Sequence, residues 1–122
     1  VKRPAAEVLR DYLEAYVKLS ASMPQIRRIM TQQSTQESNR IEWLVDNYLR
    51  ENFEAIIDLI ARGQREGAIR SGDPARLYYM IVSIAATPFT TGGGYRLLTD
   101  RDIFGRKEVR ELIKLLQETL FI

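Results

Sequence analysis

The sequence predicts an all-α domain, a bundle of five or six helices in orthogonal and antiparallel packing. Apolar residues recur at three- and four-residue spacing along most of the chain. Glycine and proline fall between these periodic segments, and no segment shows the strict alternation of a strand. A chain of 122 residues is long enough to bury a real core, so residues 1–122 are predicted to form one domain.

The first half of the chain predicts three helices separated by proline and a polar turn. Pro4 suits a first helical turn, and this helix should end before Pro24, because the residue before a proline avoids helical angles. Pro24 starts a shorter helix, and "TQQSTQESN" reads as a polar turn. A long pattern then runs from Ser38 or Asn39 to Arg65, as one helix or as two with a break near Asn52. The first helix carries an apolar stripe of Val8, Leu9, Tyr12, Leu13, Tyr16 and Val17.

The stretch "RGQREGAIRSGDP", residues 62–74, contains three glycines and raises the question of a phosphate-binding loop. A phosphate-binding P-loop needs a preceding strand and a Gly-Lys-Ser/Thr ending, and this stretch has neither. We interpret it as a turn between helices. Gly63 and Gly67 end one helix, Gly67 in the left-handed conformation, and Asp73-Pro74 caps the next.

The next two predicted helices carry most of the remaining apolar residues. Residues 74–89 are apolar around nearly the whole circumference, so this helix should be covered on both sides, with Pro88 kinking or ending it. Residues 77–95 carry no charge, but proline and glycine shorten the helical part, which favours a buried helix over a membrane span. The last helix begins near Arg106, with a stripe of Val109, Leu112, Ile113, Leu116 and Leu120.

The composition narrows the possible chemistry. The sequence has no cysteine and no histidine, which excludes disulfides and thiolate sites and removes the commonest general base and transition-metal ligand. A net charge of +2 is too small to argue for nucleic-acid binding. Glu51, Glu54 and Asp58 share a helix face, but di-metal bundles at such spacing also use histidine, so a solvated face is predicted. We therefore predict no enzyme activity, no metal site and no cofactor.

Trp43 lies off the apolar stripe of its helix. Two interpretations stay open: a rim residue against a neighbouring helix, or a wall of an internal ligand pocket. Several tyrosines, with Ser83 and Thr87, fall within helical core segments. Such a mixture fits a mostly apolar cavity with a few polar groups.

The order of these elements resembles the C-terminal domain of tetracycline-repressor-like (TetR/AcrR) transcriptional regulators. The resemblance rests on "IIDLIARGQREGAIRSGDPARLYYMIVSIAATPF", on "YRLLTD", on the terminal "VRELIKLLQETLF", and on "MPQIRRIM" as the family's second helix of this domain. It spans nearly the whole chain. It implies a regulatory domain that binds a small effector with a substantial apolar part, forms a homodimer, and controls DNA binding through a separate N-terminal helix-turn-helix.

The resemblance also implies where these functions lie. The effector would enter a pocket among the first four helices, for which the candidates are Tyr16, Met30, Trp43, Tyr48, Tyr79 and Ser83. Tyr79 and Ser83 are alternatively placed at the dimer seam. The helix from Asp73 and the last helix would pair with their copies in a second subunit. The candidate interface residues are Tyr78, Ile81, Ala85, Ala86, Phe89, Val109, Leu112, Leu116 and Leu120.

One part of the family pattern is missing, because nothing in these residues matches the helix-turn-helix. DNA binding is therefore expected only of a parent protein, in which Val1 to Pro4 would lead into this domain. The expected location is the cytoplasm, without membrane association. A stand-alone helical module that binds another protein is the alternative, and a small helical enzyme is the weakest hypothesis.

Overall fold

The structure, a computed structural model, describes residues 3–34 and 39–122 and is all-helical over these ranges, as predicted. The short α3, a π-helical turn and α4 follow one another without a break, so the described chain folds as six helical segments. The elements are α1 (Ala5–Ser22), α2 (Pro24–Ser34), α3 (Asn39–Leu44), the π-helical turn η1 (Val45–Leu49), α4 (Arg50–Arg65), α5 (Pro74–Thr90), α6 (Gly92–Thr99) and α7 (Arg106–Leu120).

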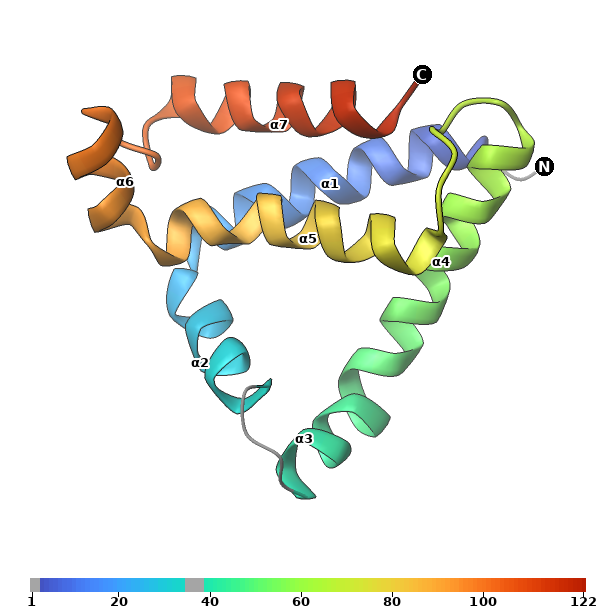
Figure 1. Cartoon of the computed structure of the whole chain (residues 1–122), viewed down its shortest axis with the longest axis horizontal. Helices are drawn as coiled ribbons and strands as arrows, with labels where there is room; N and C mark the ends of the chain where they lie inside the picture. Colours follow the sequence, from blue (N-terminus) through green and yellow to red (C-terminus); the bar gives the residue numbers. More distant parts are fainter. Residues whose placement is uncertain (1–2, 35–38) are drawn as a thin grey trace.

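The helices are arranged around α1 and α5 (Figure 1). In this view α7 runs along one side of these two helices, antiparallel to both, while α2 and the α3–α4 rod extend from their opposite ends on the other side. α2 contacts α3, so α2, α5 and the α3–α4 rod form the three sides of a triangle. α1 contacts α2, α4, α5 and α7, and α5 contacts the same neighbours of α1 and also α6, so these two helices form the centre of the fold.

The core is built on the apolar stripe predicted for the first helix. Leu9, Leu13 and Val17 of α1 are at most 1 % exposed. They belong to one cluster with residues that α4, α5 and α7 contribute. Full burial of one such side chain stabilises the fold by about 1.5–3 kcal/mol. The partners include Ile60, Ile81, Phe89, Leu116 and Leu120, each 0 % exposed.

The helix boundaries largely follow the proline and capping signals. α1 ends before Pro24, and α5 begins at Pro74, where the Asp73 carboxylate accepts a hydrogen bond from the Arg76 N–H at 3.0 Å. Pro88 does not stop α5, which continues to Thr90. A proline in the last turn removes one hydrogen bond close to carbonyls that the helix end leaves free anyway, so the cost is small.

The turn after α4 differs from the prediction at Gly63. This glycine lies inside α4, and only Gly67, with φ of +77°, closes the helix in the left-handed conformation. The carbonyl of Gly63 accepts hydrogen bonds from the N–H groups of Ala68 and Ile69, at 2.9 and 3.3 Å. The Ile69 side chain then folds back onto Gly63, and Ile69 itself forms an antiparallel bridge with Phe121 at the end of α7.

The surface of α5 is also less apolar than predicted. Arg76, Tyr79, Ser83 and Thr87, spaced at three and four residues, form an exposed line along this helix. The apolar residues on its other sides face α1, α4 and α7. Within the described ranges, no helix combines the length and the apolar character needed to cross a bilayer.

The Gly63→Ala substitution is expected to destabilise the domain by about 1–3 kcal/mol, because the added methyl group has no room against the Ile69 side chain. The added Cβ would overlap Ile69 Cδ1 and lie 2.8 Å from Ile69 Cγ1, and Ile69 is only 2 % exposed. Gly93→Ala is the matched control, since nothing lies within 4 Å of its Cβ. Urea denaturation followed by circular dichroism compares the two, and equal stabilities would contradict the packing at Gly63.

Candidate functional site

A cavity of about 200 Å³ lies where α1, α2, α4 and α5 meet. Among the described residues that line it, none carries a charge at neutral pH, and most are apolar or aromatic. The lining residues are Tyr16, Leu19, Ser20, Met23, Ile26, Leu49, Asn52 and Tyr78. A concave, mainly apolar site with a few polar groups is the usual form of a small-molecule pocket.

The second half of α1 and the start of α2 form one wall. Tyr16 and Ser20 are four residues apart, as are Leu19 and Met23, and such spacing places these residues on one side of the helix axis. Leu19 is 55 % exposed and Met23 39 % exposed, although both are apolar. Ile26 of α2 is 44 % exposed and extends this surface. Apolar side chains therefore surround the mouth of the cavity and remain in contact with water.

The opposite wall depends on the π-helical turn. In η1 the Arg50 N–H donates to the Val45 carbonyl, five residues back, instead of four. One extra residue is thus accommodated, and residues on either side of the turn change face relative to a regular α-helix. Leu49 at the end of η1 and Asn52 in α4 line the cavity. A regular helix would give α3 a different orientation relative to these two residues.

Aromatic contacts support the cavity from both sides. Tyr16 packs against Tyr12 on α1, with ring centroids 5.8 Å apart. Tyr78 on α5 packs edge-to-face against Phe53 of α4 at 4.9 Å and against Tyr79 at 5.5 Å. Such pairs contribute about 0.5–1.5 kcal/mol beyond burial and fix ring orientation. The two tyrosines of the lining are therefore held by neighbours outside it.

Three basic side chains on the lining helices have partners at the surface. Lys18 Nζ lies 2.8 Å from Glu14 Oε1 on α1, and Arg50 Nε lies 3.5 Å from Asp46 Oδ1. Arg28 Nε on α2 donates to the Thr90 carbonyl at 3.1 Å. The described side chains that line the cavity are all uncharged, so the wall itself carries no charge.

The structure brings one of the six predicted pocket residues into this cavity. Tyr16 lines it, whereas Trp43, Tyr48 and Tyr79 are 55, 64 and 66 % exposed and are not among its lining residues. Trp43 and Tyr48 pack against each other at the surface, with ring centroids 5.3 Å apart. Ser83 is exposed on the outer line of α5. The Met30 side chain lies outside the described part of the structure.

The nine predicted interface residues divide into two groups. Six of them, Ile81, Ala85, Ala86, Phe89, Leu116 and Leu120, are at most 1 % exposed within this single chain. They are core residues, because a side chain without accessible surface cannot contact a second subunit. Val109 and Leu112 are half-buried on α7. Tyr78, also half-buried, lines the cavity instead of an outer face.

Seven of the eight lining residues were not pocket candidates from the sequence, although one of them, Ser20, carries a signal in its spacing. Continuing the α1 stripe from Val17 by three residues reaches Ser20, a polar residue in an otherwise apolar series. A serine at a core position indicates either a buried hydrogen bond or a polar contact with a ligand. Leu19, Met23, Ile26, Leu49 and Asn52 carried no such signal, because their role depends on how α2 and α4 approach α1.

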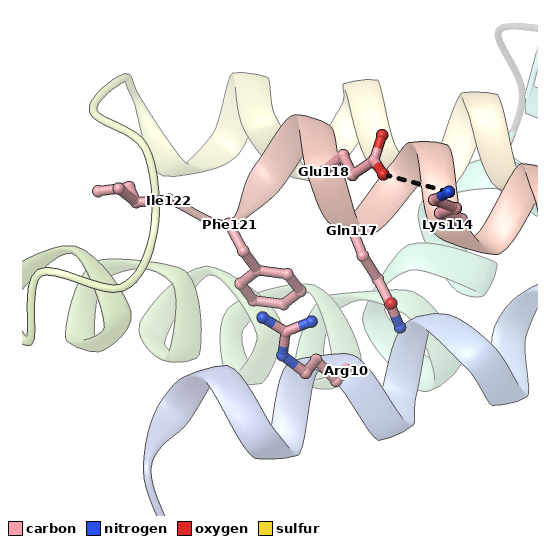
Figure 2. Close-up of a pocket in the computed structure, with 6 residues that line it drawn as sticks. All are labelled: Arg10, Lys114, Gln117, Glu118, Phe121 and Ile122. Atoms are coloured by element: carbon pink, nitrogen blue, oxygen red, sulfur yellow. Dashed lines mark ion pairs between the residues drawn. The ribbon is translucent and has the colours of Figure 1, made fainter.

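Figure 2 shows a second hollow, between α1 and the end of α7. The Arg10 guanidinium lies 4.2 Å from the centroid of the Phe121 ring, and Lys114 Nζ lies 4.0 Å from Glu118 Oε1. The charged side chains of this open hollow already interact with neighbours inside it. Among the described residues, no group of three or more acidic side chains could hold a metal ion. The candidate site is therefore the cavity between α1, α2, α4 and α5.

A comparison with known families identifies the type of domain. Residues 6–120 match the family described as "Tetracyclin repressor-like, C-terminal domain". The chain belongs to this family. No curated protein matches the sequence. Membership of this family indicates a regulator domain.

This tetracycline repressor-like domain holds the start of α1 firmly against the end of α4. The Ala5 N–H donates to Glu66 Oε1 at 3.0 Å, and Arg62 Nη2 donates to the Arg3 carbonyl at 2.6 Å. Pro4 has no side-chain hydrogen-bonding group, so Glu66 serves as the N-terminal cap of α1. α1 is thus held by these two hydrogen bonds at its start and lines the cavity at its end.

The Tyr12→Phe substitution is expected to raise the free energy of unfolding by about 1–3 kcal/mol. The Tyr12 hydroxyl is buried beside the cavity wall and finds no hydrogen-bond partner among the described residues. Removing it relieves the cost of an unsatisfied polar group and keeps the ring contact with Tyr16. Thermal and urea denaturation of the variant measure the change.

Tyr95→Phe provides the contrast, because the Tyr95 hydroxyl donates to Glu108 Oε2 at 2.8 Å. This variant should lose stability. The hydrogen bond to Glu108 raises the pKa of Tyr95, so its contribution is present below about pH 10 and lost as the pH rises through the raised value. A Tyr12→Phe variant less stable than the wild type would show that the buried hydroxyl has a partner in solution.

Proposed function

We propose that this chain is the effector-binding and dimerisation domain of a transcriptional regulator, with the cavity between α1, α2, α4 and α5 as the effector site. The observation that carries the proposal is an uncharged, aromatic-lined cavity of about 200 Å³ inside a tetracycline repressor-like domain. Effector binding would control an N-terminal DNA-binding domain of the parent protein. DNA contact would thus occur through that domain and not through these residues.

Dimerisation is supported by an incompletely covered face on α5 and α7, which we call the α5–α7 face. The two helices contact each other, and the members of this face are only half-buried or are exposed within one chain. Leu115 is the extreme case, an apolar side chain that is 56 % exposed. A second copy packed across this face would form a four-helix interface. The α5–α7 face comprises Met80 and Ile84 of α5 with Leu112, Leu115 and Thr119 of α7.

Two shared helices provide a physical link between effector and dimer. α5 contributes Tyr78 to the cavity, while Met80 and Ile84 on the same helix belong to the α5–α7 face. α1 runs from the cavity wall to its first turn, where Glu66 and Arg62 of the α4 end hydrogen-bond to it. An effector that fits one arrangement of these helices better than another shifts the population toward that arrangement.

The dimer is tested by measuring mass with light scattering or sedimentation at micromolar concentration. We expect a dimer for the wild type and a monomer for Leu115→Glu, because the variant places a charge in the centre of the α5–α7 face. Leu97→Glu is the matched control, since Leu97 is 89 % exposed on α6 and lies outside that face. A monomeric wild type would reject the dimer.

The same measurement distinguishes the alternative function, a stand-alone module whose apolar face binds a different protein. That alternative predicts a monomeric wild type that keeps its fold. A dimer that persists in Leu115→Glu would place the interface elsewhere on the molecule.

The effector site is tested by a thermal-shift screen of small molecules with the wild type and Leu49→Trp. The larger ring fills the cavity, so hits that stabilise the wild type should lose their effect in the variant. A hit at 100 times its Kd should add about 2.7 kcal/mol to the free energy of unfolding. Leu98→Trp is the control, because Leu98 is 88 % exposed on α6. Hits that stabilise Leu49→Trp as strongly as the wild type would place binding outside this cavity.

A further inference from the structure

One lining residue of the cavity has a hydrogen-bonding group that the protein does not use. Ser20 is 8 % exposed and is the one polar side chain that the described residues bury. Its hydroxyl makes no hydrogen bond within the described part of the chain, and Ser20 lines the cavity. Among the described residues, only Tyr12 has a side-chain oxygen that is both sealed from solvent and unpaired, so the Ser20 oxygen stays open to the cavity, and a molecule that displaces water there must replace its hydrogen bond.

The neighbouring serine shows that this state is not imposed by the end of the helix. Ser22, two residues later on α1, is exposed and donates to the Lys18 and Leu19 carbonyls at 3.0 and 3.2 Å. Serine in a helix commonly makes such bonds to its own backbone. Ser20, whose side chain is largely buried, does not make one. The amide of Asn52 on the opposite wall is the second polar group of the lining outside the tyrosines.

The other residues of the lining favour an uncharged ligand. Apart from the two polar groups and two phenols, the described lining consists of Leu19, Met23, Ile26 and Leu49. Moving an ionic group from water into such a site costs far more than one neutral hydrogen bond returns. At the surface of these helices, Lys18 pairs with Glu14 and Arg50 with Asp46.

We infer that the cavity takes an uncharged, mainly apolar molecule with one hydrogen-bonding group, and that Ser20 recognises that group. This inference rests on the proposed effector function and names the chemical class of the effector. A serine hydroxyl both donates and accepts, so it accommodates an alcohol, a phenol or a carbonyl. The volume of about 200 Å³ lies below the range of drug-sized pockets, which begins at about 300 Å³, so the molecule is small.

The test uses four probes that share one benzene ring and differ in the group attached: toluene, benzyl alcohol, benzoate and benzylammonium. Binding to the whole domain at neutral pH is measured by protein-observed NMR titration. Benzyl alcohol should bind most tightly, and toluene about three- to tenfold more weakly, because it leaves Ser20 without a partner. The two ions should bind at least about tenfold more weakly than the alcohol.

The Ser20→Ala variant isolates the hydroxyl. It should weaken benzyl alcohol about three- to tenfold, to the level of toluene, and leave the Kd of toluene unchanged. The folded state should not lose stability, since no hydrogen bond within the described chain is removed. Ser22→Ala is the matched control on the same helix, and it should leave the Kd of every probe unchanged.

The outcomes separate this inference from the function beneath it. Benzoate or benzylammonium binding in the cavity as tightly as benzyl alcohol would overturn the inference and leave the effector site standing. An unchanged Kd for benzyl alcohol in Ser20→Ala would overturn the role of Ser20 alone. If none of the four probes shifted the resonances of Tyr16, Ser20 or Tyr78 at millimolar concentration, both the inference and the proposed effector site would be rejected.

Discussion

The burial of one side of α1 is the constraint on which the rest of this structure depends. Leu9, Leu13 and Val17 have essentially no accessible surface, and no single neighbouring helix could cover them. α5, α4 and α7 are all needed, and each of them contacts α1. The turn after α4 and the end of α7 are then joined by the bridge between Ile69 and Phe121. The loss of α1 would expose the apolar faces of three helices at once.

The cavity lies where this cover ends. Along α1 the buried stripe passes from Val17 to Ser20, and beyond it the apolar residues Leu19 and Met23 are substantially exposed. α7 packs along the other side of the molecule, so α2, the α3–α4 rod and α5 surround this end (Figure 1). The π-helical turn sets how the rod approaches. The proposed effector would therefore cover apolar surface that the protein leaves exposed at this end of α1.

A single helical step decided several assignments on α5. Adjacent residues point about 100° apart on a helix, so Tyr78 lines the cavity while Tyr79 is 66 % exposed. The sequence shows both as aromatic residues in an apolar segment and contains nothing that orders them. Likewise Ile81, Ala85 and Phe89 suited a dimer seam by composition, yet they fill the core of one chain. Both α1 and α4 pack against α5, and the apolar pattern of the α5 sequence does not determine which of its faces they cover.

By itself, the sequence determined the helical class, the stripe of α1, the helix starts at Pro24 and Asp73-Pro74, the left-handed Gly67 and the family resemblance. These are local properties, since periodicity, proline geometry and capping act within a few residues. Only the tertiary structure decided that Gly63 continues a helix, that Ser20 and Asn52 share a cavity with Tyr78, and that Trp43 does not. These outcomes depend on the angles at which distant helices meet, and such angles are set by the packing of the whole core.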